Sequence, residues 1–352
     1  MRRVTIGDVA KRAGVHQATV SRALNARTHH QISPETIARV EAAAIELGYV
    51  PNAMARGLRT SSSMSIGVVI PDLTNPFFPP IVRGIEDGLS PLGYTALVIN
   101  TDGNPEAEKA AIASLVARQV DGFIIATGQL GTTTIGSLAH VEIPAVLVNR
   151  AASGVNFPLV AGNDAIGMQQ AVEHLVDQGH RSITHISGPF AYSTSQVRVE
   201  AFHAEVGKYP SVAGKTIEAD SLTIAEGERV MDAIVRTGAD HDSSAKNAKE
   251  PPTAILAGND LIALGVYRAL RKHGKKCPED FSVIGFNDMA FAEDFSPPLT
   301  TVRVPKFDMG VEAARLLLEF ISSRSEAPSE LLLPVELVVR ESTAPPLTRG
   351  TA

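Results

Sequence analysis

Residues 4–25, VTIGDVAKRAGVHQATVSRALN, contain two short helical patterns joined by a tight turn. Thr5 begins a capping box with the acid three positions later, so that each side chain can satisfy a free backbone amide at the start of a helix. Gly14 can take the left-handed conformation that commonly ends a helix. Val20 and Leu24 recur on one face of the next helical segment. Two such helices predict a helix-turn-helix, whose second helix enters the major groove of DNA.

The segment after this motif predicts a third helix and then a hinge. Ser33 can cap the third helix, with Pro34 at its first position, and the helix would complete a three-helix core before Gly48. The segment Asn52–Arg59 predicts a further helix of about two turns, and an isolated helix of that length is marginal in water. It could therefore act as an order–disorder switch. Residues 60–63, TSSS, are typical of a linker.

The charge of the chain is distributed unevenly. The 352 residues carry a formal net charge of −6 at pH 7. Residues 1–62 contain nine Lys and Arg against four Asp and Glu, a net +5, which leaves −11 for the other 290 residues. A basic head on an acidic body indicates that only the head binds a polyanion. Chance clustering of charge is the alternative explanation.

Length and composition exclude several classes of protein. A single hydrophobic core stops growing at about 250–300 residues, so a chain of 352 residues indicates more than one domain. A hydrophobic fraction of 44% argues against general disorder. The sequence has no run of about 20 apolar residues, and its first residues lack the apolar stretch of a secretory signal. With Cys277 as the single cysteine, these features predict a cytoplasmic protein.

From residue 65 onwards, continuous apolar strands alternate with helical stretches. The predicted strands of the first series are 66–71, 94–100, 120–126 and 143–149, and those of the second are 183–188, 253–258 and 281–286. This alternation predicts parallel sheets that are covered on both faces by helices. The expected fold class is therefore an α/β body of two doubly wound parallel-sheet lobes, with an N-terminal all-α helix-turn-helix head.

The domain boundaries follow from these patterns. The expected domains are residues 1–49 for the head, 50–63 for the hinge helix and linker, 64–163 plus 291–325 for the first lobe, and 164–290 plus 326–345 for the second lobe. This assignment includes a return of the chain to the first lobe. The strand at 299–303 and the helix around 311–320 are both expected there.

Five motifs follow one another in the first 58 residues of the chain. They are VTIGDVA at 4–10, AGV at 13–15, TVSRALN at 19–25, YVPN at 49–52 and ARGL at 55–58. Together they resemble the lactose-repressor and purine-repressor family of bacterial transcription regulators, and the resemblance continues nearly to the C-terminus. It implies a homodimeric repressor that binds a near-palindromic double-stranded operator. It also implies a body similar to a periplasmic sugar-binding protein.

The resemblance and the side-chain chemistry together predict which residues of the head contact DNA. Gln17, Ala18 and Arg22 would face base edges, since Gln can pair with adenine, Arg can pair with guanine and Ala can contact a thymine methyl group. The residues expected to contact phosphate or to cap a helix are Thr5, Thr19, Ser21 and Asn25. Arg22 could alternatively be a solvated helix residue.

Three further positions concern the hinge and the cap of the recognition helix. The resemblance implies that Leu58 enters a central base step of the minor groove and kinks the duplex, with Ala55 allowing close approach; packing of Leu58 on the body is the alternative. His16 stands where the family usually has a capping serine, and imidazole caps less well than a hydroxyl. His16 could instead contact DNA and make binding sensitive to pH, or be an exposed residue of no consequence.

The resemblance further implies a small-molecule effector in the crevice between the lobes, where strands have their carboxyl ends. The candidate residues that follow these strands are Phe77, Phe78, Asn149, Arg150, Thr194, Arg198 and Asp260. The two phenylalanines could stack on a sugar or purine face, and Arg198 with Asp260 would grip adjacent hydroxyls. A pentose, hexose or glycoside is expected rather than a purine, because the crevice offers few other aromatics. Each position could alternatively be an ordinary strand-end turn.

Two other functions compete with this interpretation, a solute-binding protein for sugar uptake and an enzyme on a doubly wound fold. Neither explains the head, and the sequence has no dinucleotide-binding glycine motif, no P-loop and no converging catalytic set. No cofactor is expected, and His174, His180 and His185 lack the spacing of a zinc site. Asp164 and Asp288 are expected to be structural. The effector, the operator and the direction of the response remain open.

Overall fold

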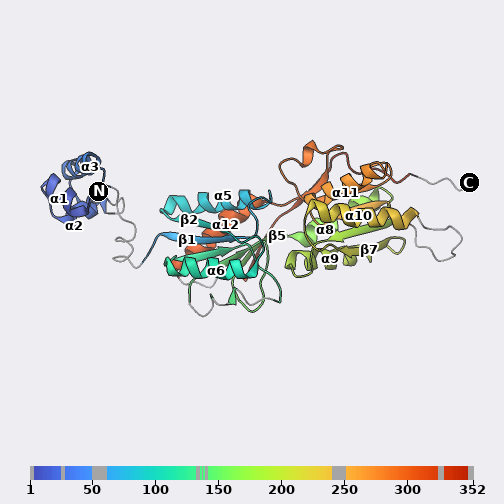
Figure 1. Ribbon diagram of the computed structural model, residues 1–352, viewed down its shortest axis with the longest axis horizontal. Coiled ribbons are helices and arrows are strands. Elements are labelled where there is room, and N and C mark those ends of the chain that lie inside the picture. The colour runs from blue at the N-terminus through green and yellow to red at the C-terminus, as the bar shows by residue number, and fades with distance from the viewer. Residues whose placement is uncertain are drawn as a thin grey trace, which may run out of the picture. The chain divides into compact units, whose positions relative to one another are not determined.

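The computed structural model describes residues 4–24, 28–49, 62–131, 135–136, 138, 142–239, 251–323 and 329–347. The chain divides into two compact units, residues 1–64 and residues 65–352 (Figure 1). No helix in the described part of the chain is long and apolar enough to cross a membrane. The predicted DNA-contact positions Asn25, Ala55 and Leu58 lie outside the described residues.

The first unit is a three-helix domain, as the sequence predicted. Its helices are α1 (Ile6–Ala13), α2 (Gln17–Ala23) and α3 (Pro34–Leu47), with the 3-10 turn η1 (His29–Gln31) between the last two. The capping box is present, because Asp8 N donates to Thr5 Oγ1 at 3.4 Å and Thr5 N donates to Asp8 Oδ2 at 2.9 Å. Val9, Val20 and Val40, one from each helix, are fully buried and form the centre of the core.

Six parallel strands form the sheet of the first lobe, in the order β11-β5-β4-β3-β1-β2. They are β1 (Ser65–Ile70), β2 (Thr95–Asn100), β3 (Gly122–Ile125), β4 (Ala145–Val148), β5 (Leu159–Gly162) and β11 (Glu330–Leu333). Helices α5 (Phe78–Leu89) and α12 (Lys306–Ser323) pack together on one face, and α6 (Pro105–Ala117) covers the other (Figure 1). This two-sided cover explains why β1, β3 and β4 are continuously apolar.

The second lobe repeats this design, with the strand order β12-β10-β9-β8-β6-β7. Its strands are β6 (Ser182–Ser187), β7 (Ala213–Glu218), β8 (Ala254–Ala257), β9 (Ser282–Asn287), β10 (Thr300–Arg303) and β12 (Glu336–Val338). Only the edge pair of β10 and β12 is antiparallel among the described pairings. The pair α8 (Asp164–Asp177) and α9 (Ser193–Val206) packs together, as does the pair α10 (Ile224–Ala239) and α11 (Asp260–Lys272).

The sequence-based placement of the strand at 299–303 is wrong. That strand, β10, pairs with β9 in the second sheet, so it does not return to the first lobe. The chain returns only with α12, which packs on α5, β3, β4 and β5. β11 then pairs with β5 in the first sheet, although residues 326–345 were expected in the second lobe. Both misplacements arise because an apolar strand pattern does not specify which of two similar sheets completes its hydrogen bonds.

Glycines allow the paired helices of each lobe to approach closely. A Cβ atom at Gly84 of α5 would overlap the carbonyl oxygen of Phe307 in the first turn of α12. The second lobe has the same arrangement, since a Cβ at Gly265 of α11 would overlap the carbonyl oxygen of Ile224 in α10. Backbone packs directly against backbone at both crossings, so each helix pair behaves as one rigid layer over its sheet.

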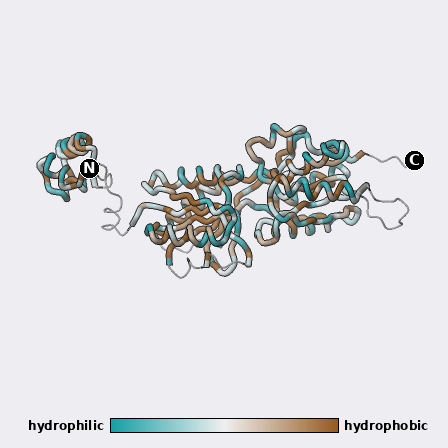
Figure 2. The backbone as a smooth tube through the Cα atoms, in the orientation of Figure 1, coloured by the Kyte–Doolittle hydropathy of each residue, from teal (hydrophilic) through white to brown (hydrophobic). Residues whose placement is uncertain are grey.

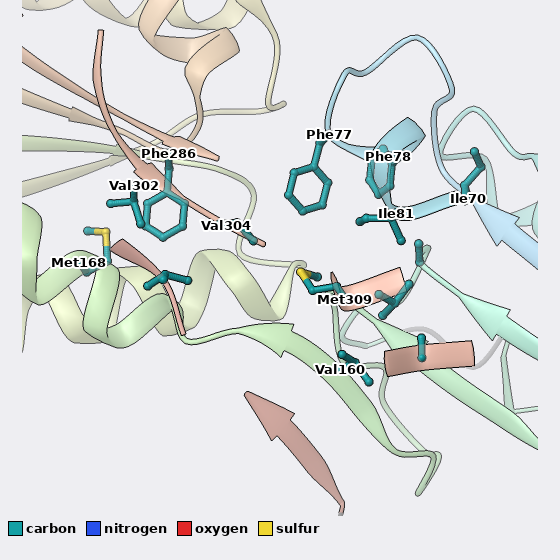
Figure 3. Packing of buried hydrophobic residues seen from close by; sticks show 14 of the residues in the cluster. Ile70, Phe77, Phe78, Ile81, Val160, Met168, Phe286, Val302, Val304 and Met309 are labelled. Atoms are coloured by element: carbon teal, nitrogen blue, oxygen red, sulfur yellow. The ribbon is translucent and has the colours of Figure 1, made fainter. Parts of the chain in front are cut away.

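The hydrophobic core of the body continues from one lobe to the other. Figure 2 shows hydrophobic residues gathered along the strands of both sheets. One buried cluster includes Phe77 and Met309 of the first lobe together with Phe286 and Val304 of the second (Figure 3). Apolar side chains thus surround the segments in which the chain passes from one lobe to the other. These segments lie beside the crevice in which the candidate ligand residues were expected.

Candidate functional site

The recognition helix α2 presents its predicted base-contact residues to solvent. Gln17, Ala18 and Arg22 are all exposed on α2, whereas Val20 faces the core. Residues 17, 18 and 22 lie on one helical face, since positions four apart are neighbours on a helix. A polar face of this kind is suited to readout of base edges in a major groove.

Of the expected phosphate contacts, three lie among the described residues, and each has a structural role in the head or is partly buried. The hydroxyl of Thr5 donates to Asp8 Oδ2 at 2.7 Å, so Thr5 acts as the cap of α1. Thr19 and Ser21 are half-buried on α2. His16 does fill the capping position of α2, where its Nδ1 accepts a hydrogen bond from Ala18 N at 3.2 Å. A ring nitrogen of His16 therefore serves as the acceptor of this cap.

A second candidate site is a cavity between the two lobes, which we call the interlobe cavity. It is a hollow of about 310 Å³ that includes space open to solvent, and about 20 Å³ of it can hold the centres of water molecules. Its lining residues are Asn75, Phe77, Phe78, Asn149, Arg150, Thr194, Arg198, Leu222, Asn259 and Asn287. They come from the ends of strands β1, β4, β8 and β9 and from the start of α9, which is the edge where an α/β fold binds its ligands. Six of the seven predicted ligand residues meet there.

Arg198 is held rigidly in the wall of the interlobe cavity. Its Nε donates to Asp164 Oδ2 at 2.8 Å, its Nη1 donates to the carbonyl oxygen of Gly258 at 2.7 Å, and its guanidinium lies 3.7 Å from the ring centroid of Phe286. Burial raises the pKa of Asp164, and the adjacent guanidinium opposes this rise. Nη2 makes no hydrogen bond to the described residues, so the fork keeps one donor free for a ligand.

Asp260, the predicted partner of Arg198, does not line the interlobe cavity. Its carboxylate is fully buried, with Oδ1 accepting from Thr301 Oγ1 at 2.6 Å and Oδ2 accepting from Met289 N at 2.8 Å. Burial raises the pKa of Asp260 to about 7. The predicted pairing is wrong because Asp260 is the first residue of α11 and turns under the loop that follows β9. The ion-pair partner of Arg198 is Asp164, which the sequence marked as structural.

Asparagines occupy the strand-end positions that Asp260 was expected to supply. Asn259 caps α11 by accepting from Ile262 N at 2.8 Å, and its Nδ2 donates to the carbonyl oxygen of Leu222 at 3.2 Å. Asn287 ends β9 with φ +111°, and its Oδ1 is buried without a hydrogen-bond partner in the described structure. A polar residue at or just after the end of a buried parallel strand is the available sequence signal for both. No comparable pattern marks Leu222.

Arg150 and the two phenylalanines complete the interlobe cavity. Arg150 is 7% exposed and lies 3.6 Å from the ring centroid of Tyr192, a residue of the second lobe. Its Nε is buried and has no hydrogen-bond partner among the described residues, and burial lowers its pKa. Phe77 and Phe78 meet edge to face with centroids 5.2 Å apart, which gives the cavity an apolar wall.

Comparison with known protein families distinguishes the same N-terminal head and C-terminal body. The model of bacterial regulatory proteins of the lacI family matches residues 5–52, and the model of a periplasmic binding protein-like domain matches residues 172–343. The ribose operon repressor of Halalkalibacterium halodurans is 37% identical over 339 residues, which are 96% of this chain and 97% of that protein. The repressor CytR of Escherichia coli K12 is 32% identical over 339 residues, 96% of each chain.

Solved structures agree with these relatives. A lac repressor dimer bound to operator and an anti-inducer has a TM-score of 0.83 and 29% identity, covering 97% of this chain and all of that chain. A lacI-family regulator of Enterococcus faecium with bound ribose has a TM-score of 0.68 and 31% identity, covering 80% of this chain and 99% of that chain. The two relatives named above are transcriptional repressors and not enzymes. The chain therefore belongs to the lacI family of bacterial regulatory proteins.

Proposed function

We propose that this chain is a cytoplasmic, homodimeric repressor of transcription, and that a monosaccharide in the interlobe cavity controls its binding to a near-palindromic operator. One observation carries the sugar control. The interlobe cavity holds a buried donor, Arg150 Nε, and a buried acceptor, Asn287 Oδ1, and neither has a partner among the described residues. Leaving such groups unpaired costs free energy, and a sugar hydroxyl can both accept and donate.

The chemistry of the other lining residues supports a sugar ring. Phe77 and Phe78 offer an apolar surface to the C–H face of the ring, while Arg198 offers its free Nη2 to the hydroxyl edge. A ribose operon repressor and a ribose-bound regulator are among the similar proteins. Monosaccharides, D-ribose among them, are therefore the sugars to test.

The exposed face of α2 supports the operator part of the proposal. Gln17, Ala18 and Arg22 carry the base-reading chemistry, and the net charge of +5 on residues 1–62 favours a polyanion. The solved lac repressor dimer on its operator supports the dimeric arrangement.

A combined binding experiment tests both parts. Gel-shift titration with DNA from upstream of the gene should show tight binding that weakens steeply with salt, because phosphate contacts release counterions. A thermal-shift screen of monosaccharides should find one that stabilises the protein by mass action. Arg198→Lys should abolish that stabilisation, whereas Arg236→Lys on the exposed face of α10 should retain it. If no monosaccharide stabilises the wild-type protein or changes its operator affinity, sugar control is wrong.

A further inference from the structure

A second compartment adjoins the interlobe cavity on the α6 side of the first sheet. It is a hollow of about 330 Å³ that includes space open to solvent, and only about 10 Å³ of it can hold the centre of a water molecule; its walls include Thr101, Glu108, Thr127 and Tyr192. Arg150 lines both this compartment and the interlobe cavity. We call it the inner compartment. Because the two spaces share Arg150, a ligand in the interlobe cavity can place a single hydroxyl group in the inner compartment, where one water molecule fits.

Glu108 is the chemically distinctive group of the inner compartment. It lies in the first turn of α6 and is only 7% exposed, yet no cationic side chain of the described structure pairs with it. Its Oε1 accepts a hydrogen bond from Thr127 Oγ1. Burial raises the pKa of this carboxyl group. A carboxyl group offers several acceptor positions, so Glu108 can accept a further hydrogen bond, on Oε2, from a donor that enters the compartment.

The inner compartment is complete only when the two lobes are together. Tyr192 reaches it from the second lobe and stacks on Arg150. Beside it, Leu130 N donates to the carbonyl oxygen of Ala191 at 2.8 Å, and Ala151 N donates to Ser193 Oγ at 2.9 Å. These contacts close the same edge of the body that holds the interlobe cavity, so occupancy of both spaces would depend on the same closure.

Charge decides which donor fits the inner compartment. An ammonium group would lie beside the guanidinium of Arg150, and an anion would lie beside Glu108; like charges repel in both cases. A neutral hydroxyl avoids both conflicts, since it can donate to Glu108 Oε2 without bringing a charge. The space next to the sugar ring thus suits a short hydroxylated arm.

We propose that the effector is a monosaccharide with an exocyclic hydroxymethyl arm, of the hexopyranose type, and that this arm passes Arg150 and donates its hydroxyl to Glu108 in the inner compartment. The inference rests on the proposed sugar control of the interlobe cavity. It specifies Glu108 as a determinant of specificity between hexoses and the corresponding pentoses.

Matched sugars isolate the arm from the stereochemistry of the ring. The pairs are D-xylose with D-glucose, L-arabinose with D-galactose, D-lyxose with D-mannose and D-ribose with D-allose, in which each hexose differs from its pentose by one CH₂OH group. Isothermal titration of the full-length wild-type protein should find a pair whose hexose binds about tenfold or more tightly than its pentose. A hydrogen bond to a charged group accounts for a difference of this size.

Variants of Glu108 then connect the arm to the inner compartment. Glu108→Gln and Glu108→Leu should lower the affinity for the hexose to near that for the pentose, while the pentose affinity stays within about twofold. Retained pentose binding shows that each variant is folded. Glu106→Gln, on the exposed side of the same helix turn, is the matched control and should leave both affinities unchanged.

Three results would overturn the inference. If each hexose and its pentose bind equally, or the pentose binds more tightly, the inner compartment holds water and no part of the effector. If the Glu108 variants lower the affinities for hexose and pentose by the same factor, Glu108 supports the fold and does not bind the hydroxymethyl group. If none of the eight sugars binds the wild-type protein, both the proposed sugar control and the proposed role of Glu108 are wrong. Binding without a preference for hexose would contradict only the role of Glu108.

Discussion

Arg198 and Asp164 form a buried ion pair that joins α9 to the start of α8. Their side chains are 7% and 8% exposed, with Nε and Oδ2 2.8 Å apart. Removing one partner from a buried pair leaves an uncompensated charge, which typically costs about 3–5 kcal/mol. We therefore expect Asp164→Asn to lower the free energy of unfolding by about 3 kcal/mol in urea denaturation at pH 7, and to weaken sugar binding because Arg198 loses its anchor.

An exposed ion pair provides the comparison for this prediction. Arg83 and Asp87 lie 2.9 Å apart on α5 with side chains 66% and 42% exposed. Such surface pairs contribute about 0–1 kcal/mol, so Asp87→Asn should change the unfolding free energy by less than about 1 kcal/mol. Equal effects of the two substitutions would contradict the assignment of a structural role to the buried pair.

His180 predicts a pH dependence of stability. Its Nδ1 lies 2.8 Å from Thr253 Oγ1, and its Nε2 lies 2.9 Å from Ser282 Oγ and 3.0 Å from the carbonyl oxygen of Ala344. Burial lowers its pKa from 6.5 to about 4. The unfolded chain therefore binds this proton at a higher pH than the folded chain does. The stability that His180 contributes is complete above pH 6.5 and is lost as the pH falls towards 4.

Comparison with His180→Gln isolates this effect. The wild-type advantage in unfolding free energy should shrink by about 1.4 kcal/mol for each pH unit between roughly 6.5 and 4. A difference measurement is needed because Asp260, with its pKa raised to about 7, contributes with the opposite sign in the same range. Urea denaturation of both proteins from pH 7.5 to pH 5 measures the gap, and a gap that is constant with pH would show that His180 titrates normally.

At the residue scale, the sequence could predict which strand ends supply ligand residues but not which side chain at each end faces the cavity. Phe77, Arg150 and Arg198 were found because they follow strands or match a family motif. The choice of Asp260 over Asn259 was wrong because both follow β8 directly. Only the start of α11 decides that Asn259 caps the helix while Asp260 turns inward.

At the element scale, the close helix pairs make a graded prediction. Gly84→Ala places a methyl group against the backbone carbonyl of Phe307, which cannot move without separating α5 from α12. Gly88→Ala on the same helix meets a side-chain methyl, Ala314 Cβ, at 2.8 Å. Both changes gain about 1 kcal/mol of helix propensity, but overpacking typically costs about 1–3 kcal/mol or more.

The two alanine variants should therefore differ in stability. We expect Gly84→Ala to be destabilised by about 3 kcal/mol and Gly88→Ala by less than about half of that, measured as urea midpoints with unchanged slopes. If Gly88→Ala were the less stable protein, side-chain contacts rather than backbone approach would control the crossing.

Elements with a strong local signal were predictable, and those that depend on distant partners were not. The capping box of α1 and the apolar runs of β1, β3 and β9 are encoded within a few residues. β7, with the sequence AGKTIE, lies at a sheet edge and is partly exposed along its length, so it has no continuous apolar run. The apolar pattern of β10 is compatible with either sheet. The hydrogen bonds from Thr301 to Asp260 and from Thr300 N to Ser342 place it in the second sheet.

At the scale of the whole molecule, the chain passes between the lobes after β5, after β10 and after β11, and the core that joins the lobes includes Phe77, which also lines the interlobe cavity. The contacts across the cavity edge in the described structure include the hydrogen bond from Ala151 N to Ser193 Oγ and the stacking of Arg150 on Tyr192. A ligand that touches both lobes binds the closed form. Its apparent affinity therefore scales with the fraction of molecules that are closed.

Ser193→Ala tests this coupling. It removes the bond to Ala151 N, and the net contribution of one hydrogen bond is about 1 kcal/mol, so the ratio of closed to open molecules should fall by about fivefold. The sugar affinity should fall by up to the same factor, because it scales with the closed fraction. The sugar concentration that half-changes operator binding in a gel shift should rise by the same factor, because ligand and operator act on one equilibrium. Ser322→Ala removes an exposed hydroxyl that donates to Glu319 O within α12, far from the cavity lining; it is the matched control and should change neither value. A Ser193→Ala protein with wild-type sugar affinity would show that this contact does not limit closure, and the stacking of Arg150 on Tyr192 would then be the next contact to remove.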